Sequence, residues 1–167
     1  NNQEKVNYTL NHLNKKFHKE YFGYKVDISD KDELLQVIEN IELNLNKVDV
    51  LINNVMLRAK INTTDSNFLS PENYPLEFWK NSLKNNLTGT FLTCQQFGKL
   101  MLTNNKGVIL NIVSTESLQG INPQKYIPQI PPIDYPVAKA SVINFTRYIA
   151  TYWAKNNIRA NCLVQGE

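Results

Sequence analysis

The segment GVILNIVS at residues 107–114 and the segment VDVLINN at residues 48–54 decide the fold class of this chain. Both are nearly continuous in Val, Ile and Leu, a pattern typical of strands that are covered on both faces, as in a parallel sheet. Two further runs, GYKVDIS at 23–29 and IRANCLVQ at 158–165, have a similar character. We therefore expect four buried strands in one sheet.

Helical patterns lie between these runs and complete an alternating order of strands and helices. Such an order implies right-handed crossovers and an α/β fold with a doubly wound, Rossmann-like parallel sheet. Asp30 or Asp32 could provide the N-cap of the helix that follows the first run. The spacing of apolar residues predicts a helix that follows this cap and runs to about Asn46, and further helices over about 5–17, over about 75–103 and from about Asp134 to 153.

We expect residues 1–167 to form a single, partial Rossmann-like domain that is incomplete at both termini. The chain opens inside the first predicted helix, stops directly after the last predicted strand, and shows no cap or closing helix at either end. Its 167 residues, 42% of them hydrophobic, are enough to bury a sizeable core.

Composition and charge argue against several classes of protein. The net charge of +3, from 18 basic and 15 acidic residues, is too small to indicate a nucleic acid or a membrane surface as partner. No apolar run approaches the ~18 residues of a membrane span, and no signal peptide is visible. Cys94 and Cys162 lie far apart, and His12 and His18 do not share a helix face, so no metal site is expected. We expect a cytoplasmic protein.

Two polar, turn-rich segments interrupt the alternation, at 57–73 and at 118–133, and the second contains four prolines. Loops of this length in a compact domain usually serve as lids or binding loops. Both follow the carboxyl ends of predicted strands, which is the edge where open α/β sheets bind ligands. We expect a ligand site at that edge.

Tyr135 and Lys139 are four positions apart at the start of a predicted helix, so their side chains share one face. A neighbouring ammonium favours the phenolate and lowers the pKa of a tyrosine, whose ordinary value is about 10, and this suits acid–base catalysis. The spacing alone arises by chance in many helices, where it marks an ordinary surface pair. Ser114 strengthens the catalytic interpretation, because it ends a predicted strand at the ligand edge of the sheet.

Further polar residues belong to the same edge if the sheet is parallel. Asn53 and Asn54 end the run at 48–54, and Asp27 lies near the end of the run at 23–29. Asn86 lies in the long predicted helix.

The segments DVLINN, NLTGTF, GVILNIVS, YPVAKA and NIRANCLVQG follow one another in the order found in short-chain dehydrogenases/reductases, so the chain resembles that family over nearly its whole length. The resemblance implies an NAD(P)-dependent oxidoreductase that interconverts a small-molecule alcohol and a carbonyl. By motif, Tyr135 would exchange a proton with the substrate oxygen, and Lys139 would hold the nicotinamide ribose and lower the tyrosine pKa. Ser114 would hydrogen-bond the substrate oxygen, and Asn86 would keep a water in the proton relay.

The resemblance also implies contacts to the rest of the cofactor. Asp27 and Ile28 match the pair that contacts the adenine, and Asn54, which follows Asn53, matches an asparagine whose backbone faces the adenosine ribose. The helix at 75–103 carries an apolar stripe that fits either a core-facing surface or, by the resemblance, the interface of a homodimer or homotetramer.

Several features depart from the family pattern. The family grips the cofactor pyrophosphate with a glycine-rich turn, but the six glycines of this chain are all at least nine positions apart and cannot build one. The family reads the 2′ position of the adenosine ribose at the end of its second strand, which precedes Asn1, so the choice between NAD and NADP stays open. Val55 and Met56 replace the small residues usual after the asparagines, and Gln165 replaces a proline after the last strand. The 21 positions between Ser114 and Tyr135 exceed the usual spacing, and this long loop resembles a subgroup linked to sugar modification.

Three interpretations remain. The leading one is that the parent protein is an oxidoreductase, and that this fragment alone is inactive because it lacks the pyrophosphate turn. The chain could instead be an inactive or truncated relic of such an enzyme. It could also be a binding module that uses its two long loops to hold a partner without catalysis.

Overall fold

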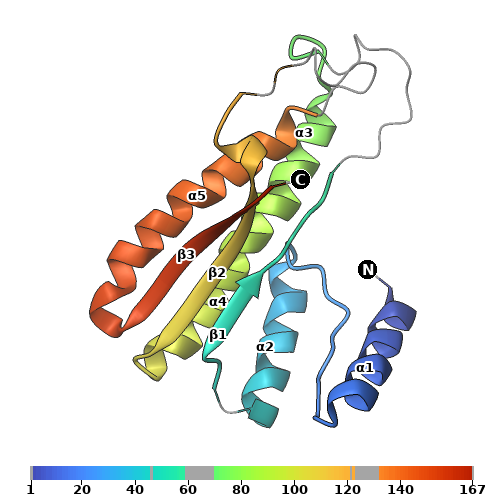
Figure 1. Cartoon of the computed structure of the whole chain (residues 1–167), viewed down its shortest axis with the longest axis vertical. Coiled ribbons are helices and arrows are strands. Elements are labelled where there is room, and N and C mark those ends of the chain that lie inside the picture. The colour runs from blue at the N-terminus through green and yellow to red at the C-terminus, as the bar shows by residue number, and fades with distance from the viewer. Residues whose placement is uncertain (1, 46, 59–69, 121, 123–131, 167) are drawn as a thin grey trace.

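The computed structural model describes residues 2–45, 47–58, 70–120, 122 and 132–166 (Figure 1). The two loops predicted at 57–73 and 118–133 lie largely outside these residues, so their expected role as lids stays a prediction.

Three parallel strands form one sheet in the order β1–β2–β3. Val50 of β1 pairs with Val108 of β2, and Gly107 of β2 pairs with Ile158 of β3. The predicted strands at 107–114 and 158–165 are confirmed at both ends, and the one at 48–54 is slightly shorter. The strands are β1 (Val50–Asn53), β2 (Gly107–Ser114) and β3 (Ile158–Gln165).

The predicted strand at 23–29 is wrong, because this segment has no regular secondary structure apart from a turn at its end. A strand exists only where a neighbour completes its ladder of hydrogen bonds. In Figure 1 the segment runs beside α1, and α2 separates it from β1 in this view. Among the described residues, no strand pairs with it.

The predicted helices are all present. The one at 75–103 is a continuous helical stretch whose middle widens into a π-helical turn, a feature that often accompanies functional sites. The helices are α1 (Gln3–Phe17), α2 (Lys31–Leu45), α3 (Leu76–Ser82), the π-helical turn (Leu83–Thr88), α4 (Gly89–Thr103) and α5 (Asp134–Trp153).

Side-chain caps set the starts of the first two helices. Asn2 accepts hydrogen bonds from the backbone of Glu4 and Lys5, so the sequence-based statement that the first helix has no cap is wrong. Asp30 rather than Asp32 caps α2, since its Oδ1 accepts from two first-turn amides.

Helices α4 and α5 pack on one face of the sheet (Figure 1). The core between them includes Cys94, Met101, Ile109 and Ile158, all at most 1% exposed. The apolar stripe of the long predicted helix therefore faces the core. On the opposite face of the sheet, Val50, Ile52 and Leu163 are exposed. The expectation that these strands are covered on both faces is therefore wrong for β1 and β3 within the described residues. The parallel order of the three described strands, with helices packed against them, confirms a Rossmann-like α/β architecture.

A group of buried polar side chains, here called the interior cluster, ties these layers together. It consists of Asn53 of β1, Thr93 of α4, Asn111 of β2 and Thr146 of α5, each at most 5% exposed. The Asn53 amide donates to Asn111 Oδ1, Thr93 Oγ1 donates to Asn53 Oδ1, and the Asn111 amide donates to Thr146 Oγ1, each at 2.8 Å. Since buried polar groups are costly only when unpaired, this closed network can lie in the core.

Gly89 brings the segment that carries Asp27 and Ile28 close to the helix layer. A Cβ at this position would lie 2.8 Å from Ile28 Cγ1, so a larger residue would push the segment away from α4. The glycine of the NLTG motif thus has a packing role here.

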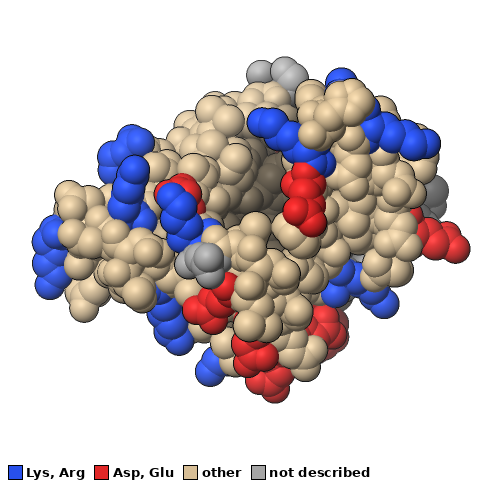
Figure 2. Space-filling model, turned by 90° about the horizontal axis from the view of Figure 1, so that it is seen from below, with Lys and Arg blue, Asp and Glu red and all other residues tan. Residues whose placement is uncertain are grey.

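Charged side chains of both signs are interspersed on the face that Figure 2 shows, around a central hollow. This face presents no large patch of a single sign.

Among the helices of the described residues, none combines the length and the apolar composition that crossing a membrane requires. Within the same residues, no three His, Cys, Asp or Glu side chains gather as a metal site would need.

Candidate active site

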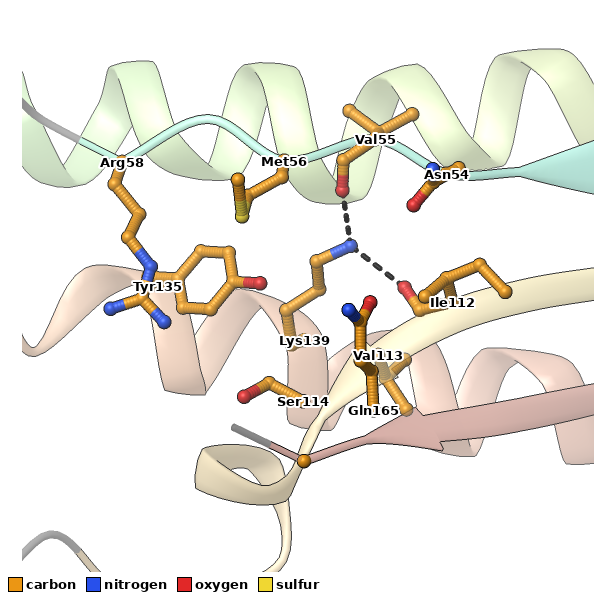
Figure 3. A pocket seen from close by; sticks show the side chains of 11 residues that line it. Asn54, Val55, Met56, Arg58, Ile112, Val113, Ser114, Tyr135, Lys139 and Gln165 are labelled. Atoms are coloured by element: carbon orange, nitrogen blue, oxygen red, sulfur yellow. Dashed lines mark hydrogen bonds between the residues drawn. The ribbon is translucent and has the colours of Figure 1, made fainter.

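A cavity of about 470 Å³ lies at the carboxyl ends of β1, β2 and β3, the edge expected to bind a ligand (Figure 3). The structure brings Ser114, Tyr135 and Lys139 together in its wall, as the sequence predicts. Its lining residues are Asn54, Val55, Met56, Arg58, Ile112, Val113, Ser114, Tyr135, Lys139, Gln165 and Gly166.

Lys139 is held at the junction of two strand ends. Its side chain is buried, and its Nζ donates to the carbonyl oxygens of Val55 at 2.5 Å and Ile112 at 2.9 Å. Burial lowers the pKa of Lys139 to about 8, because the charged form loses its hydration. An ammonium has three N–H donors, so two are used within the described chain and one is left for a ligand.

Tyr135 lies one helical turn before Lys139, and Figure 3 shows its hydroxyl directed toward the lysine amine. Lys139 Nζ is 5.9 Å from the centre of the ring, and the tyrosine is 5% exposed. Burial raises the pKa of Tyr135 above its ordinary value, and Arg58 and Glu116 act in opposite directions on it, downward and upward respectively. The direction is thus opposite to the lowering expected from Lys139, because burial outweighs the positive charge of Arg58 beside the phenol.

Arg58 lines the cavity beside the phenol and is held there by Glu116, and sequence reasoning misses both residues. Arg58 Cζ lies 4.2 Å from the centre of the Tyr135 ring, and Arg58 Nη2 donates to both carboxylate oxygens of Glu116 at 3.0 Å. Glu116 is buried, while the Arg58 side chain is 38% exposed. The two residues are 58 positions apart, so no local pattern signals the pair.

Ser114 ends β2 and starts a short 3₁₀ turn. Its Oγ accepts a hydrogen bond from the Glu116 amide at 3.2 Å, and its own amide donates to Ser117 Oγ. Because the hydroxyl acts as an acceptor in this cap, its proton stays available for a ligand oxygen. The same cap fixes the turn that presents Glu116.

Asn53 and Asn54 are neighbours in sequence but point in opposite directions, as alternate residues of a strand do. Asn54 lines the cavity, as predicted for a cofactor-binding residue. The Asn53 side chain belongs to the interior cluster and does not reach the cavity.

Asn86 is fully buried in the π-helical turn and does not line the cavity. Its amide donates to the Leu57 carbonyl at 2.7 Å, and its Oδ1 accepts from the Leu57 amide at 2.9 Å. These two bonds hold the backbone directly before Arg58. Any contact of Asn86 with a relay water stays a prediction.

Asp27 and Ile28 lie away from the cavity, in the turn before α2. The Ser29 hydroxyl and amide both donate to Asp27 Oδ1, and these bonds lower the pKa of the Asp27 carboxyl. Ile28 packs against Gly89. Their predicted contact with an adenine stays untested.

The chain as a whole matches a known family. The family model described as short chain dehydrogenase matches residues 1–167. A 3-oxoacyl-[acyl-carrier-protein] reductase from Synechocystis is 31% identical over 147 residues, which cover 88% of this chain and 53% of that protein. An NAD-dependent glycerol dehydrogenase from Listeria innocua is 28% identical over 141 residues, covering 83% of this chain and 48% of that protein.

Solved structures with this fold include an NAD⁺-bound xylitol dehydrogenase, with a TM-score of 0.84, 22% identity and coverage of 99% of this chain and 57% of that one. A 3-oxoacyl-[acyl-carrier protein] reductase from Brucella melitensis with bound NAD has a TM-score of 0.83, 24% identity and coverage of 99% and 58%. The chain thus spans about half the length of the curated relatives that it matches.

Proposed function

Because this chain belongs to the short-chain dehydrogenase family, we propose that it carries the catalytic part of an oxidoreductase that interconverts an alcohol and a carbonyl with NAD or NADP. One observation carries the proposal. The side chains of Ser114, Tyr135 and Lys139, which come from two different elements, line a single cavity at the ligand edge of the sheet.

Tyr135 is proposed as the acid that gives its proton to the substrate oxygen during reduction, and as the base in the reverse direction. Reduction of a carbonyl builds negative charge on that oxygen, and a placed proton source lowers the barrier. The hydroxyl of Ser114 is proposed as the second donor to the same oxygen. Its acceptor bond to Glu116 fixes the direction in which it can donate.

The cavity residues fit the nicotinamide-ribose half of the proposed cofactor. Lys139 has one N–H donor left for a ribose hydroxyl, and Asn54 adds an amide to the wall. When bound, the cofactor supplies or accepts the hydride, while the protein orients the substrate and moves the proton. We propose that the chain alone does not turn over, because its glycines cannot form the usual pyrophosphate turn.

A small polyhydroxylated alcohol, similar to a sugar, is the proposed substrate. The Arg58–Glu116 pair places hydrogen-bond donors and acceptors beside the proposed proton donor. Such a pair suits hydroxyl groups, which donate and accept at once. The relatives named glycerol dehydrogenase and xylitol dehydrogenase support this choice.

We also propose that the active protein is a homodimer or homotetramer assembled through α4 and α5. Phe91 of α4 and Tyr148 and Tyr152 of α5 are exposed, and the two tyrosine rings stack at 5.9 Å. A single molecular mass matching the monomer by light scattering would contradict this.

The decisive experiment is a titration of the 167-residue chain with nicotinamide mononucleotide, which requires no pyrophosphate turn. We expect weak binding, with Kd on the order of 1 mM, and at least a tenfold loss in Lys139→Ala. Lys155→Ala, a lysine remote from the cavity, is the matched control and should bind normally. Equal binding by wild type and Lys139→Ala would favour the alternatives of a relic or a module without catalysis.

A further inference from the structure

We propose that Arg58, held in place by Glu116, is a positioning residue that stabilises the phenolate of Tyr135. This inference rests on the proposed function, in which Tyr135 exchanges a proton with the substrate. It assigns a role to two residues that lie outside the family motifs.

The first support is geometric. Arg58 Cζ lies 4.2 Å from the centre of the Tyr135 ring, well within the range over which a cation interacts with an aromatic face. Lys139 Nζ is farther from the same centre, at 5.9 Å. Because a phenolate ring carries more negative charge than a phenol ring, a guanidinium over its face stabilises the ionised form.

The second support is that Arg58 is held at both ends. At the backbone, two hydrogen bonds between the Asn86 side chain and Leu57, one donated by each residue, fix Leu57, the residue directly before Arg58. At the tip, Nη2 donates to both oxygens of the buried Glu116 carboxylate. A guanidinium fixed in this way is already in place before the proton moves, so its effect costs no reorganisation.

The third support is the order in which the groups titrate. The pKa of Lys139 is about 8, while that of Tyr135 lies above its ordinary value of about 10. The lysine therefore loses its charge at a lower pH than that at which the phenol ionises. This leaves the stabilising role to the Arg58 guanidinium, which also lies nearer to the ring centre than the lysine amine.

Other charged groups near the ring are few among the described residues. Glu116 from the turn after β2 opposes Arg58, and Lys139 comes from α5. Asp134, the residue before Tyr135, accepts from the Tyr135 amide, and burial together with the Asp134 carboxylate raises the pKa of Tyr74. The two members of the Arg58–Glu116 pair thus act on the Tyr135 pKa in opposite directions. Removing one or the other charge should therefore shift this pKa in opposite directions, which a merely structural role would not do.

The test is a pH titration of the 167-residue chain labelled with tyrosine carrying ¹³C at Cζ, with the Tyr135 signal assigned through Tyr135→Phe. We expect Arg58→Met to raise the pKa of Tyr135 by roughly one unit, and Glu116→Gln to lower it by a smaller amount. Arg58→Lys, which keeps a charge but not the planar stacking, should give an intermediate value. Lys139→Met should change the pKa least.

The double variant Arg58→Met/Glu116→Gln avoids leaving a buried carboxylate without its partner, and its pKa should fall between those of the two single variants. The amide NMR spectrum of each variant is first compared with that of the wild type to check that the variant folds. If Arg58→Met does not fold, the test uses the charge-preserving Arg58→Lys and the near-isosteric Glu116→Gln. Unchanged pKa values, or shifts of the same sign in the arginine and glutamate variants, would overturn the inference. The measurement needs neither cofactor nor turnover, so such a failure would leave the proposed function to its own test.

Discussion

Two polar clusters lie close together along β1 and β2, and they differ in whether hydrogen-bond donors remain unused for a ligand. In the interior cluster, Asn53, Thr93, Asn111 and Thr146 satisfy one another in the core. At the sheet edge, Arg58, Ser114, Tyr135 and Lys139 line a cavity of about 470 Å³, and Glu116 holds Arg58 in place. These five residues are here called the edge cluster.

The edge cluster keeps donors that its own bonds do not use, such as the Ser114 hydroxyl proton and one N–H of Lys139. Burial alone therefore does not distinguish a structural polar group from a functional one. What distinguishes them is unused hydrogen-bonding capacity beside a space that a ligand can enter. Substitutions should accordingly affect stability in the interior cluster and ligand chemistry in the edge cluster.

The largest expected effect is on turnover. In a chain extended ahead of Asn1 with a glycine-rich strand–turn–helix of this family, Tyr135→Phe should lower kcat/KM for a polyol by about 10²–10⁴-fold, because the proton source is lost. Its free energy of unfolding should change by less than about 1 kcal/mol, since the ring and its packing stay. The two values are measured by cofactor absorbance and by urea unfolding. If the free energy of unfolding fell while kcat/KM stayed unchanged, Tyr135 would have a structural role and not a catalytic one.

The next effect compares two adjacent asparagines. Asn53→Ala should lower the free energy of unfolding by about 2 kcal/mol, since it removes the donor to the buried side-chain oxygen of Asn111 and one of the two acceptors near the Thr93 hydroxyl. Asn54→Ala should cost less than about 0.5 kcal/mol and instead weaken binding of nicotinamide mononucleotide. Urea unfolding of both variants is the measurement. Equal losses would erase the distinction between the two clusters.

Lys139 offers a test through pH. Its pKa is about 8 in the folded chain against an ordinary value of 10.5, so between these two pH values the unfolded chain binds a proton that the folded chain does not. The stability of the wild type should therefore rise with pH across this window, by roughly 1–3 kcal/mol relative to Lys139→Met. Below pH 8 the difference between the two proteins should be constant. A difference that is flat from pH 7 to 10.5 would mean that the lysine titrates normally.

The smallest effect concerns the reactivity of the Cys94 thiol, which accepts a hydrogen bond from Asn53 of the interior cluster. Burial raises the pKa of Cys94 to about 12, and the thiolate is the reactive form of a cysteine. Cys162 is only half-buried. A disulfide reagent at pH 8 should thus label Cys162 in the native chain and Cys94 only after unfolding. Labelling of native Cys162→Ala at a comparable rate would show that the interior cluster opens readily.

The sequence predicts most of the fold because its signals are local. The runs at 107–114 and 158–165 become strands at the expected ends, and the apolar spacing locates the α-helices of the described residues, though not the short 3₁₀ turns. The segment at 23–29 has an equally suitable composition but forms no strand, because a strand depends on a neighbour that composition cannot supply.

The candidate site was predictable only in part. Ser114, Tyr135 and Lys139 belong to motifs whose order in the chain can be recognised, and they meet as expected. The direction of the Asn53 side chain could not be read from a strand that is apolar on both faces. Arg58 and Glu116 come together only through tertiary structure, 58 positions apart, and neither stands out by residue type or spacing.

The most direct test of the central claim is to map nicotinamide mononucleotide on the 167-residue chain by backbone amide NMR. If the edge cluster binds this ligand, the amide chemical shifts of residues 54–56, 112–114 and 135–139 should change progressively as the ligand concentration rises. The amide shifts of Thr93 and Thr146 should stay nearly constant. Changes that concentrate instead in the separate pocket between α1 and α2, around Gln3, Glu33 and Asn40, would contradict the assignment of the active site.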